Sequence, residues 1–244
     1  MIDFHTHVLP GIDDGSCDLD MTEAMLREEA GQGVGLVVAT PHFYANRTSV
    51  RHFLDNRDEA YKSVVERIES SGEPEAFPKL LTGAEVYYFS GIGTAEMLPK
   101  LTIGDTGVIL VEMPFEPWTK EMYRDIETII EKQKLKVVLA HIERYVEFQR
   151  DRGVYEAVMA LPLTPQINAG TFIKKKTGLF HPDKKRKFAL AFREAHPRMI
   201  LGSDCHNLSS RKPNLREGRA AIEAAGGADA LREIDAAAKE VLDL

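Results

Sequence analysis

The sequence is poor in cysteine, in long apolar segments and in net positive charge, and each shortage excludes a class of protein. Its two cysteines, Cys17 and Cys205, cannot form a disulfide framework, which favours a reducing cytoplasm. No apolar run approaches the roughly 20 residues that a membrane-spanning helix needs, so we expect no membrane insertion. The first residues lack the pattern of a signal peptide. The net charge of −7 argues against general nucleic-acid binding.

The chain is long enough and apolar enough to form one sizeable folded unit. Its 244 residues, 43% of them hydrophobic, come close to the roughly 250 residues of a single α/β barrel. We find no internal repeat, low-complexity tract or long linker, and therefore expect one domain over residues 1–244. Two basic runs stand out, at 174–176 and 184–187. Such runs are usually solvated surface, and the alternative is attraction for an acidic partner.

Short apolar segments alternate with longer helical patterns along the whole chain. Strands are expected at residues 2–5, 35–40, 80–85, 108–112, 136–141, 165–168 and 199–204. Several are continuous apolar runs, which indicates strands buried on both faces, as in a parallel sheet. Helices are expected at residues 20–32, 50–70, 121–134, 154–161, 183–195 and 215–225, with a last helix within 226–244.

This alternation predicts β-α-β units and an α/β fold. Seven strands are too few for the regular eight-stranded barrel, so we expect a distorted seven-stranded (β/α)7, TIM-like barrel. An open, doubly wound sheet is the alternative.

Side chains that can bind metals follow the strands at their carboxyl ends. His5 and His7 are two residues apart at the end of the first strand, a spacing that directs both rings to one side. Glu112 closes a continuous apolar strand, where a carboxylate is costly unless it is paired or bound to a metal. Six of the seven expected strands end in or beside His, Glu or Asp. Each residue alone has a structural explanation, but together they predict a metal site at the C-terminal face of a barrel.

The candidate ligands number nine, including an aspartate from the first loop whose Asp-Gly sequence is otherwise an ordinary turn. They are His5, His7, Asp14, His42, Glu85, Glu112, His141, Asp204 and His206. This is too many for one ion, whereas two or three divalent ions that share a bridging carboxylate would accommodate them. Nitrogen and oxygen ligands without thiolate suit Mn²⁺, with Fe²⁺ or Zn²⁺ as alternatives.

Two arginines lie just beyond candidate ligands. Arg144 comes three residues after His141, and Arg211 comes five residues after His206. Arginine binds phosphate through two N–H groups at once. An arginine is ordinarily a surface residue, but these positions favour contact with a phosphate at the metal site.

The motifs resemble those of the polymerase and histidinol phosphatase (PHP) superfamily, and most of all its bacterial tyrosine phosphatases of capsule and exopolysaccharide synthesis. The opening Met-Ile-Asp-Phe-His-Thr-His-Val-Leu-Pro-Gly-Ile-Asp-Asp-Gly is similar to theirs almost position by position. The same holds for Ala-Thr-Pro-His at 39–42, Gly-Ala-Glu at 83–85, Val-Glu-Met-Pro-Phe at 111–115 and Gly-Ser-Asp-Cys-His-Asn at 202–207. One departure is Ile142, where family members commonly carry proline.

The resemblance implies a role for each candidate ligand. One metal would be held by His5, His7, Glu85 and Asp204; Glu85 would bridge to a second, held with Glu112 and His141; and Asp14, His42 and His206 would hold a third. Arg144 and Arg211 would contact the phosphate. The implied partner is a phosphotyrosine protein, such as the tail of a bacterial tyrosine kinase, and a homo-oligomer remains open.

The expected reaction is hydrolysis of a phosphate monoester by metal-activated water, without a covalent enzyme intermediate. Asp13 and Glu143 are candidate proton carriers, with purely structural roles as the alternative. Three rival readings remain. Cys205 and Arg211 formally fit the C-x5-R signature of cysteine-dependent tyrosine phosphatases. The substrate could instead be histidinol phosphate or another small phosphate ester. The chain could also be an inactive barrel that serves as a binding module.

Overall fold

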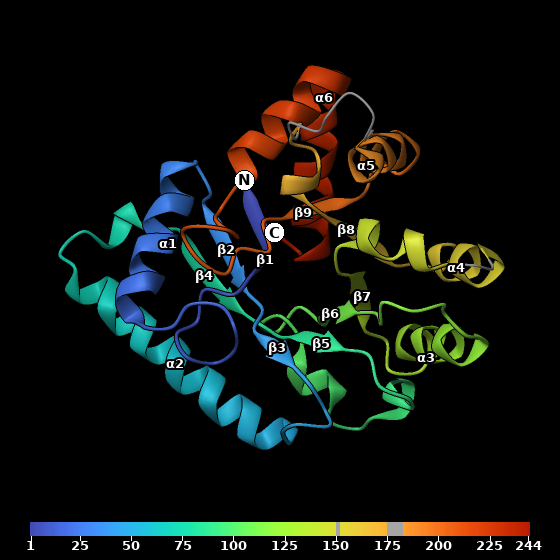
Figure 1. Ribbon diagram of the computed structural model, residues 1–244. Helices are drawn as coiled ribbons and strands as arrows, with labels where there is room; N and C mark the ends of the chain where they lie inside the picture. Colours follow the sequence, from blue (N-terminus) through green and yellow to red (C-terminus); the bar gives the residue numbers. More distant parts are fainter. Residues whose placement is uncertain (150–151, 175–182) are drawn as a thin grey trace.

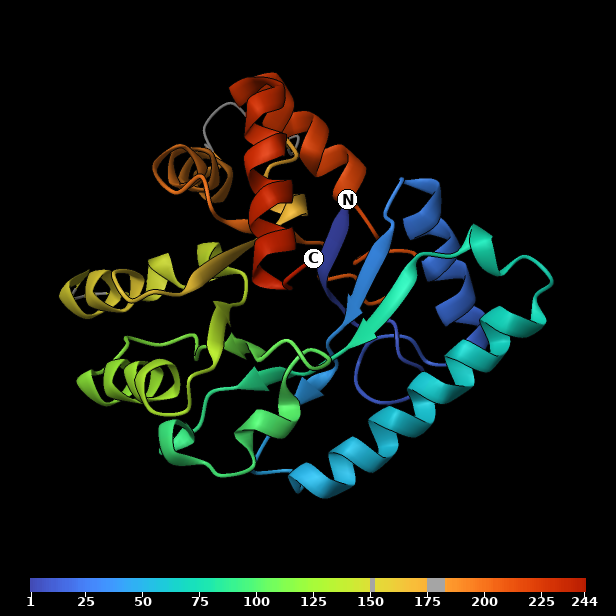
Figure 2. The same cartoon turned by 180° about the vertical axis from the view of Figure 1, so that it is seen from behind.

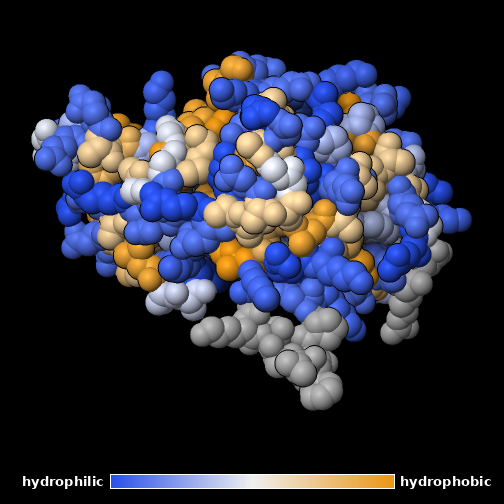
Figure 3. Space-filling view, turned by 90° about the horizontal axis from the view of Figure 1, so that it is seen from above, coloured by the Kyte–Doolittle hydropathy of each residue, from blue (hydrophilic) through white to orange (hydrophobic). Residues whose placement is uncertain are grey.

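The computed structural model describes residues 1–149, 152–174 and 183–244. Lys175 and Lys176 of the first basic run lie outside the described residues. Strands occupy the middle of the molecule and the larger helices lie around them (Figures 1 and 2). Seen from above, hydrophilic residues cover much of the surface and apolar patches lie between them (Figure 3). Within the described ranges, no helix is long and apolar enough to cross a membrane.

The described residues form nine strands, all paired in parallel. They are β1 (Ile2–Thr6), β2 (Leu36–Ala39), β3 (His42–Phe43), β4 (Lys79–Thr82), β5 (Glu85–Tyr87), β6 (Val108–Glu112), β7 (Lys136–Leu139), β8 (Thr164–Asn168) and β9 (Ile200–Gly202). One sheet has the order β1-β2-β4 and the other β3-β5-β6-β7-β8-β9.

The two sheets are joined at both ends of the strand order. At one end, β3 and β5 continue the paths of β2 and β4 along the chain. At the other, a parallel bridge links Thr6 to Cys205, and the Asp204 amide donates to the His5 carbonyl at 2.8 Å. The first and last strands are therefore neighbours, and the parallel sheet is curled. This arrangement disagrees with the alternative of an open sheet.

The count of nine differs from the expected seven for two reasons. The expected strand at 80–85 is divided into β4 and β5, and the short strand β3 follows the end of the expected strand at 35–40. Pro41 separates β2 from β3, since proline has no N–H to donate to a ladder. Gly83 lies between β4 and β5, where an added Cβ would come within 2.7 Å of the Ile103 side chain. At both breaks the sheet can bend, so that His42 and Glu85 come to lie side by side in the β3–β5 register.

The helices agree closely with the expected segments. They are α1 (Leu19–Gly31), α2 (Val50–Ser70), α3 (Lys120–Glu131), α4 (Arg152–Met159), α5 (Lys184–Ala195) and α6 (Leu215–Val241). Side-chain oxygens of Asp18, Ser49 and Thr119 accept from backbone amides and so cap α1, α2 and α3. The expected final helix is part of α6, which is kinked at Gly227 with a φ of 74°. Short 3-10 turns fill connections at 74–76, 92–94, 98–101, 142–144, 146–148 and 169–171.

Apolar side chains from strands far apart in the sequence meet in one buried cluster. Phe4, Val38, Leu110, Val138 and Ile200 belong to β1, β2, β6, β7 and β9, and all are fully buried. Because these strands lie around the curled sheet, the cluster fills the space that the sheet encloses. Polar side chains at the ends of the same strands therefore lie over this buried apolar cluster, which excludes water from below them.

Candidate metal centre

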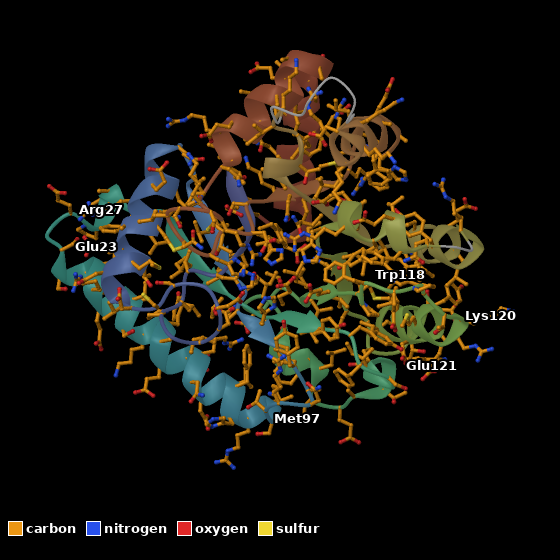
Figure 4. The ribbon with its side chains drawn as sticks, viewed as in Figure 1. Glu23, Arg27, Met97, Trp118, Lys120 and Glu121 are labelled. Carbon is orange, nitrogen blue, oxygen red and sulfur yellow. The ribbon has the colours of Figure 1, made fainter. Side chains whose placement is uncertain are left out.

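All nine predicted ligands meet in one cluster, on the side of the curled sheet where β1, β2, β4, β6, β7 and β9 end. Nitrogen and oxygen atoms gather at the middle of the ribbon, whereas charged pairs such as Glu23 and Arg27 lie on peripheral helices (Figure 4). His5 and Glu112 are in the last two residues of β1 and β6, and His42 and Glu85 are the first residues of β3 and β5. The remaining ligands lie in the segments that follow β1, β7 and β9, namely His7, Asp14, His141, Asp204 and His206. His5, His7, Glu85, Asp204 and His206 are no more than 3% exposed.

Glu85 is at the centre of the cluster. Its Oε2 lies 3.1 Å from His5 Nε2, 3.3 Å from His7 Nε2 and 2.9 Å from His42 Nδ1. Its other oxygen, Oε1, lies 3.0 Å from His141 Nε2. Oε2 thus faces three imidazole rings and Oε1 faces a fourth. A carboxylate that bridges two ions requires this placement.

Three sets of ligand atoms lie close enough together to hold an ion. Within each set, all atoms are within 4.8 Å of one another; the sets are His5, His7 and Glu85; His42, Glu85 and Glu112; and His7, Asp14, His42 and His206. Asp204 Oδ1 lies 3.7 Å from His5 Nε2 and 3.5 Å from His7 Nε2, beside the first set. His141 Nε2 lies 3.5 Å from Glu112 Oε1, beside the second.

The spacing of these atoms fits coordination better than hydrogen bonding. His5 Nε2 and His7 Nε2 are 3.1 Å apart, although two ring nitrogens repel unless a proton or cation lies between them. Glu85 Oε2, His42 Nδ1 and His206 Nε2 are buried without a hydrogen-bond partner. Ligand atoms about 2.0–2.2 Å from one ion lie roughly 3.0–3.5 Å from each other, which matches these separations. The residues present therefore fit divalent cations.

The charges within the cluster compensate each other. Burial raises the pKa of Glu85, but His5, His141 and His42 outweigh this and hold it well below its usual value. Burial and Arg144 lower the pKa of His141, yet hydrogen bonds to Glu112 and Glu85 raise it to about 9. Glu85 is thus charged and attracts positive charge, which protons on histidine or bound cations can supply.

Several neighbouring residues orient the ligands. Asp13 Oδ2 lies 2.6 Å from His7 Nδ1 and accepts from the His42 amide at 2.9 Å. Gln166 Oε1 lies 3.2 Å from His5 Nδ1 and accepts from the His141 amide at 2.7 Å. Such partners hold the opposite ring nitrogen toward the site.

The backbone is also constrained at the site. His141 and Asp204 have φ angles of 31° and 55°, in the left-handed region that non-glycine residues rarely adopt. At Gly202, an added Cβ would come within 2.5 Å of the His5 Cβ. Both strand ends therefore hold their ligands in positions that ordinary extended backbone would not give.

Both predicted arginines converge on one carboxylate. An Arg144 Nη2 hydrogen-bonds Asp204 Oδ2, and Arg211 Nη2 donates to Asp204 Oδ1 at 2.7 Å. Arg211 Nη1 also lies 3.7 Å from Asp14 Oδ2. A guanidinium carries five N–H donors, so each arginine keeps donors for an anion beside the cluster.

Sequence reasoning missed Gln166 and Asn168, which end the one expected strand without His, Glu or Asp. The Asn168 side-chain amide donates to Asp204 Oδ2 at 2.8 Å and accepts from Gln166 at 2.9 Å. Their spacing of two residues on a buried strand was the available signal. Glu143 bonds Thr171 at 2.9 Å and the Asn168 amide at 3.3 Å, contacts that suit a structural role.

The geometry disfavours the cysteine mechanism. Cys205 is fully buried, with its sulfur 3.6 Å from Glu29 Oε1. Burial, with the charges of Glu29 and Asp3, raises its thiol pKa well above the usual value. Cys205 packs in the apolar cluster of Val8 and Leu9, while Arg211 reaches Asp204. A protonated thiol in this position cannot be the nucleophile for a phosphate held by Arg211.

Comparison with known families places this cluster in context. The family model described as capsular polysaccharide synthesis, CpsB/CapC, matches residues 1–242. The chain belongs to this family. The family assignment confirms the resemblance that the strand-end motifs indicated.

Individual CpsB/CapC relatives match over most of the chain. It is 27% identical to the tyrosine-protein phosphatase CpsB of Streptococcus agalactiae serotype III (strain NEM316), covering 89% of this chain and 87% of that protein. It is 28% identical to the tyrosine-protein phosphatase YwqE of Bacillus subtilis (strain 168), covering 94% and 86%.

The fold is shared with a solved structure. A chain from the crystal structures of YwqE from B. subtilis and CpsB from Streptococcus pneumoniae, described as unique metal-dependent tyrosine phosphatases, superposes with a TM-score of 0.79. The two chains are 23% identical, and the alignment covers 100% of this chain and 94% of the other.

Proposed function

We propose that this protein is a metal-dependent protein-tyrosine phosphatase. The observation that carries the proposal is the meeting of five histidines and four carboxylates beside Arg144 and Arg211 at one end of the sheet. The relatives named tyrosine-protein phosphatase in S. agalactiae and B. subtilis support it, as does membership of the CpsB/CapC family.

We assign the ligands to two or three divalent ions, with Mn²⁺ as the first choice and Fe²⁺ or Zn²⁺ as alternatives. His5, His7, Glu85 and Asp204 hold one; Glu85, Glu112 and His141 hold a second; and Asp14, His42 and His206 hold a third. The support is the set of close ligand atoms around Glu85 and the buried atoms without hydrogen-bond partners. His42 lies close to two of these sets and can serve either.

The proposed reaction is hydrolysis of a phosphate monoester. Bound divalent ions supply Lewis acidity that activates water and neutralises phosphoryl charge. Arg144 and Arg211 direct their remaining N–H groups at the equatorial oxygens and orient the phosphate. Asp13 and Gln166 keep His7 and His5 in place. A tyrosine leaving group has a pKa of about 10 and needs little help from a general acid.

The wider assignment is one cytoplasmic domain with a distorted seven-stranded barrel, in which β2 with β3 and β4 with β5 each count as one strand. The bridge between Thr6 and Cys205 supports the barrel, and the scarcity of cysteine supports the compartment. The proposed partner is a phosphotyrosine protein of capsule or exopolysaccharide synthesis, namely the tail of a bacterial tyrosine kinase. A flexible tail can reach a site that loops surround.

A phosphatase screen on purified protein tests this proposal. Metal content is measured first, and turnover is then compared for a phosphotyrosine peptide, histidinol phosphate and a simple aryl phosphate. We expect the highest kcat/KM for the peptide, loss of turnover after exhaustive chelation and its recovery with Mn²⁺. A preference for histidinol phosphate would reassign the substrate and leave the metal centre standing. Full activity in metal-free protein would refute the metal centre itself.

A further inference from the structure

A cleft opens directly beside the metal cluster, lined by the first loop, the segment that joins β3 to α2 and the first turns of α2. Its volume is about 590 Å³, and its lining includes Asp14 and His42. Ile12, Tyr44 and Phe53 supply apolar walls. Part of a substrate that lies in this cleft is therefore next to the reacting phosphate.

Arg47 has a defined position in the wall of this cleft. Its guanidinium carbon lies 4.3 Å from the centre of the Tyr44 ring, within the range of a cation–π contact. The Arg47 amide also donates to the Tyr44 carbonyl at 2.9 Å, which closes a tight turn between the two residues. Tyr44 in turn packs between His42 and Tyr87, with ring centres 5.3 and 5.5 Å away. The Tyr44 ring thus lies between the Arg47 guanidinium and His42, one of the candidate ligands.

Arg47 makes no ion pair with any acidic side chain among the described residues. The acids that line the same cleft already have partners, since Asp13 lies 2.6 Å from His7 and Asp14 lies 3.4 Å from His206. Arg144 and Arg211 are directed at Asp204. Arg47 is therefore a separate, oriented cation that faces an open cleft. A guanidinium in this state favours a carboxylate or phosphate partner.

We propose that Arg47, positioned by Tyr44, binds an anionic group of the substrate chain beside the phosphotyrosine that is hydrolysed. The group is a carboxylate or a second phosphate, which share negative charge and paired oxygen acceptors. This inference rests on the proposed phosphatase function and adds to it a preference for acidic sequences. Arg47 is a specificity-determining residue here, and Tyr44 is a positioning residue.

The test uses Mn²⁺-loaded full-length protein and three phosphotyrosine peptides of one sequence. One has aspartate on both sides of the phosphotyrosine, one has asparagine there, and one has a second phosphotyrosine in place of an aspartate. Because Arg47 is exposed, we expect kcat/KM to be roughly two- to fivefold higher for the aspartate peptide than for the asparagine peptide. The doubly phosphorylated peptide shows whether phosphate or carboxylate is preferred.

Variants then locate the effect. Arg47→Ala should bring the aspartate-to-asparagine ratio close to one, mainly through a higher KM for the aspartate peptide. Arg47→Glu should reverse the preference, so that a further peptide with lysine on both sides of the phosphotyrosine has a higher kcat/KM than the aspartate peptide. Tyr44→Phe keeps the ring face and should keep the ratio, whereas Tyr44→Leu should lower it. The matched control is Arg51→Ala, which removes an exposed arginine outside the cleft lining and should preserve the ratio.

Each adverse outcome has a distinct meaning. A wild-type ratio near one, with normal hydrolysis of an aryl phosphate, would overturn the inference and leave the proposed function intact. If Arg51→Ala lowered the aspartate-to-asparagine ratio of kcat/KM as much as Arg47→Ala, the inference would be overturned. The preference would then come from the summed positive charge of this surface and not from Arg47. Equal losses for both peptides in Arg47→Ala would overturn it by assigning Arg47 to the reacting phosphate. Inactivity of the wild type on every substrate would overturn the function and the inference together.

Discussion

Asp13 Oδ2 lies 2.6 Å from His7 Nδ1, so the opposite nitrogen of the His7 ring is held toward Glu85. The same carboxylate oxygen accepts from the His42 amide, and Oδ1 accepts from the Gly15 amide at 3.0 Å. One aspartate that is outside the assigned ligand set thus ties the first loop, β1 and β3 together. Its effect on metal binding can be measured.

Asp13→Ala should weaken metal binding by about 10- to 100-fold, because the His7 ring loses the partner that fixes its orientation. Titration of apoprotein with Mn²⁺ measures the change. Asp55→Ala is the control, since Asp55 is an exposed carboxylate on α2 and is not one of the nine candidate ligands. Unchanged affinity in Asp13→Ala would show that His7 keeps its orientation without the carboxylate.

Cys205→Ser and His141→Ala distinguish the metal mechanism from a thiolate mechanism. Cys205→Ser should retain most activity, because the thiol is buried away from the cluster. His141→Ala should lose about a thousandfold or more in kcat, because a side chain assigned to the metal site is removed. The measurement is kcat of both variants on an aryl phosphate. A large loss in Cys205→Ser with little loss in His141→Ala would favour the thiolate mechanism.

Arg211→Lys should lower phosphatase activity, although the substitution keeps the positive charge at this position. Lysine keeps the charge but loses the planar set of donors, of which one reaches Asp204 and the others are the ones that we propose for phosphate. We expect kcat/KM for a phosphotyrosine peptide to fall by roughly tenfold or more, a change of about 1.4 kcal/mol per factor of ten. Activity equal to the wild type would show that Arg211 acts as charge alone.

Gly202→Ala should destabilise the fold and disturb His5. The added Cβ would be 2.5 Å from the His5 Cβ, and overpacking of this kind costs about 1–3 kcal/mol. We expect Tm to fall by about 3–10 °C, with weaker metal binding. Gly31→Ala is the matched control, because an added Cβ meets nothing within 4 Å there. Equal stability in the two variants would contradict the close approach of β9 to β1.

Glu29 should make stability depend on pH. Burial, with the charge of nearby Asp3, raises its pKa well above the usual value of 4.5. Its contribution to stability is therefore complete below about pH 4.5 and declines as pH rises through the folded-state pKa. Glu29→Gln should become more stable relative to the wild type between pH 5 and pH 8. Urea midpoints of metal-loaded protein measure this, with exposed Glu59→Gln as the control; a constant difference would contradict it.

The sequence predicted the site better than the details of the sheet. His5, His7, Glu85, Glu112 and Asp204 could be found because a polar group at the end of a buried strand is costly without a partner. The meeting of their side chains followed from parallel strands having one common end. The ligand assignment and the roles of the arginines stay predictions.

Other features depend on contacts that no local pattern contains. The break at Gly83 comes from the approach of Ile103, twenty positions further along the chain. Gln166 was overlooked because an amide on a strand is ordinarily unremarkable, and its role appears only when His5 and the His141 amide lie beside it. The left-handed backbone of His141 is likewise imposed by its surroundings.

The bridge between Thr6 and Cys205 has a consequence for how the protein is made. His5 and His7 leave the ribosome about two hundred residues before Asp204 and His206. The growing chain therefore exposes its first histidines long before their partners exist. Because pairing so distant in sequence forms slowly, a complete cluster assembles only after nearly every strand has emerged, and no early fragment can hold the full set of ligands.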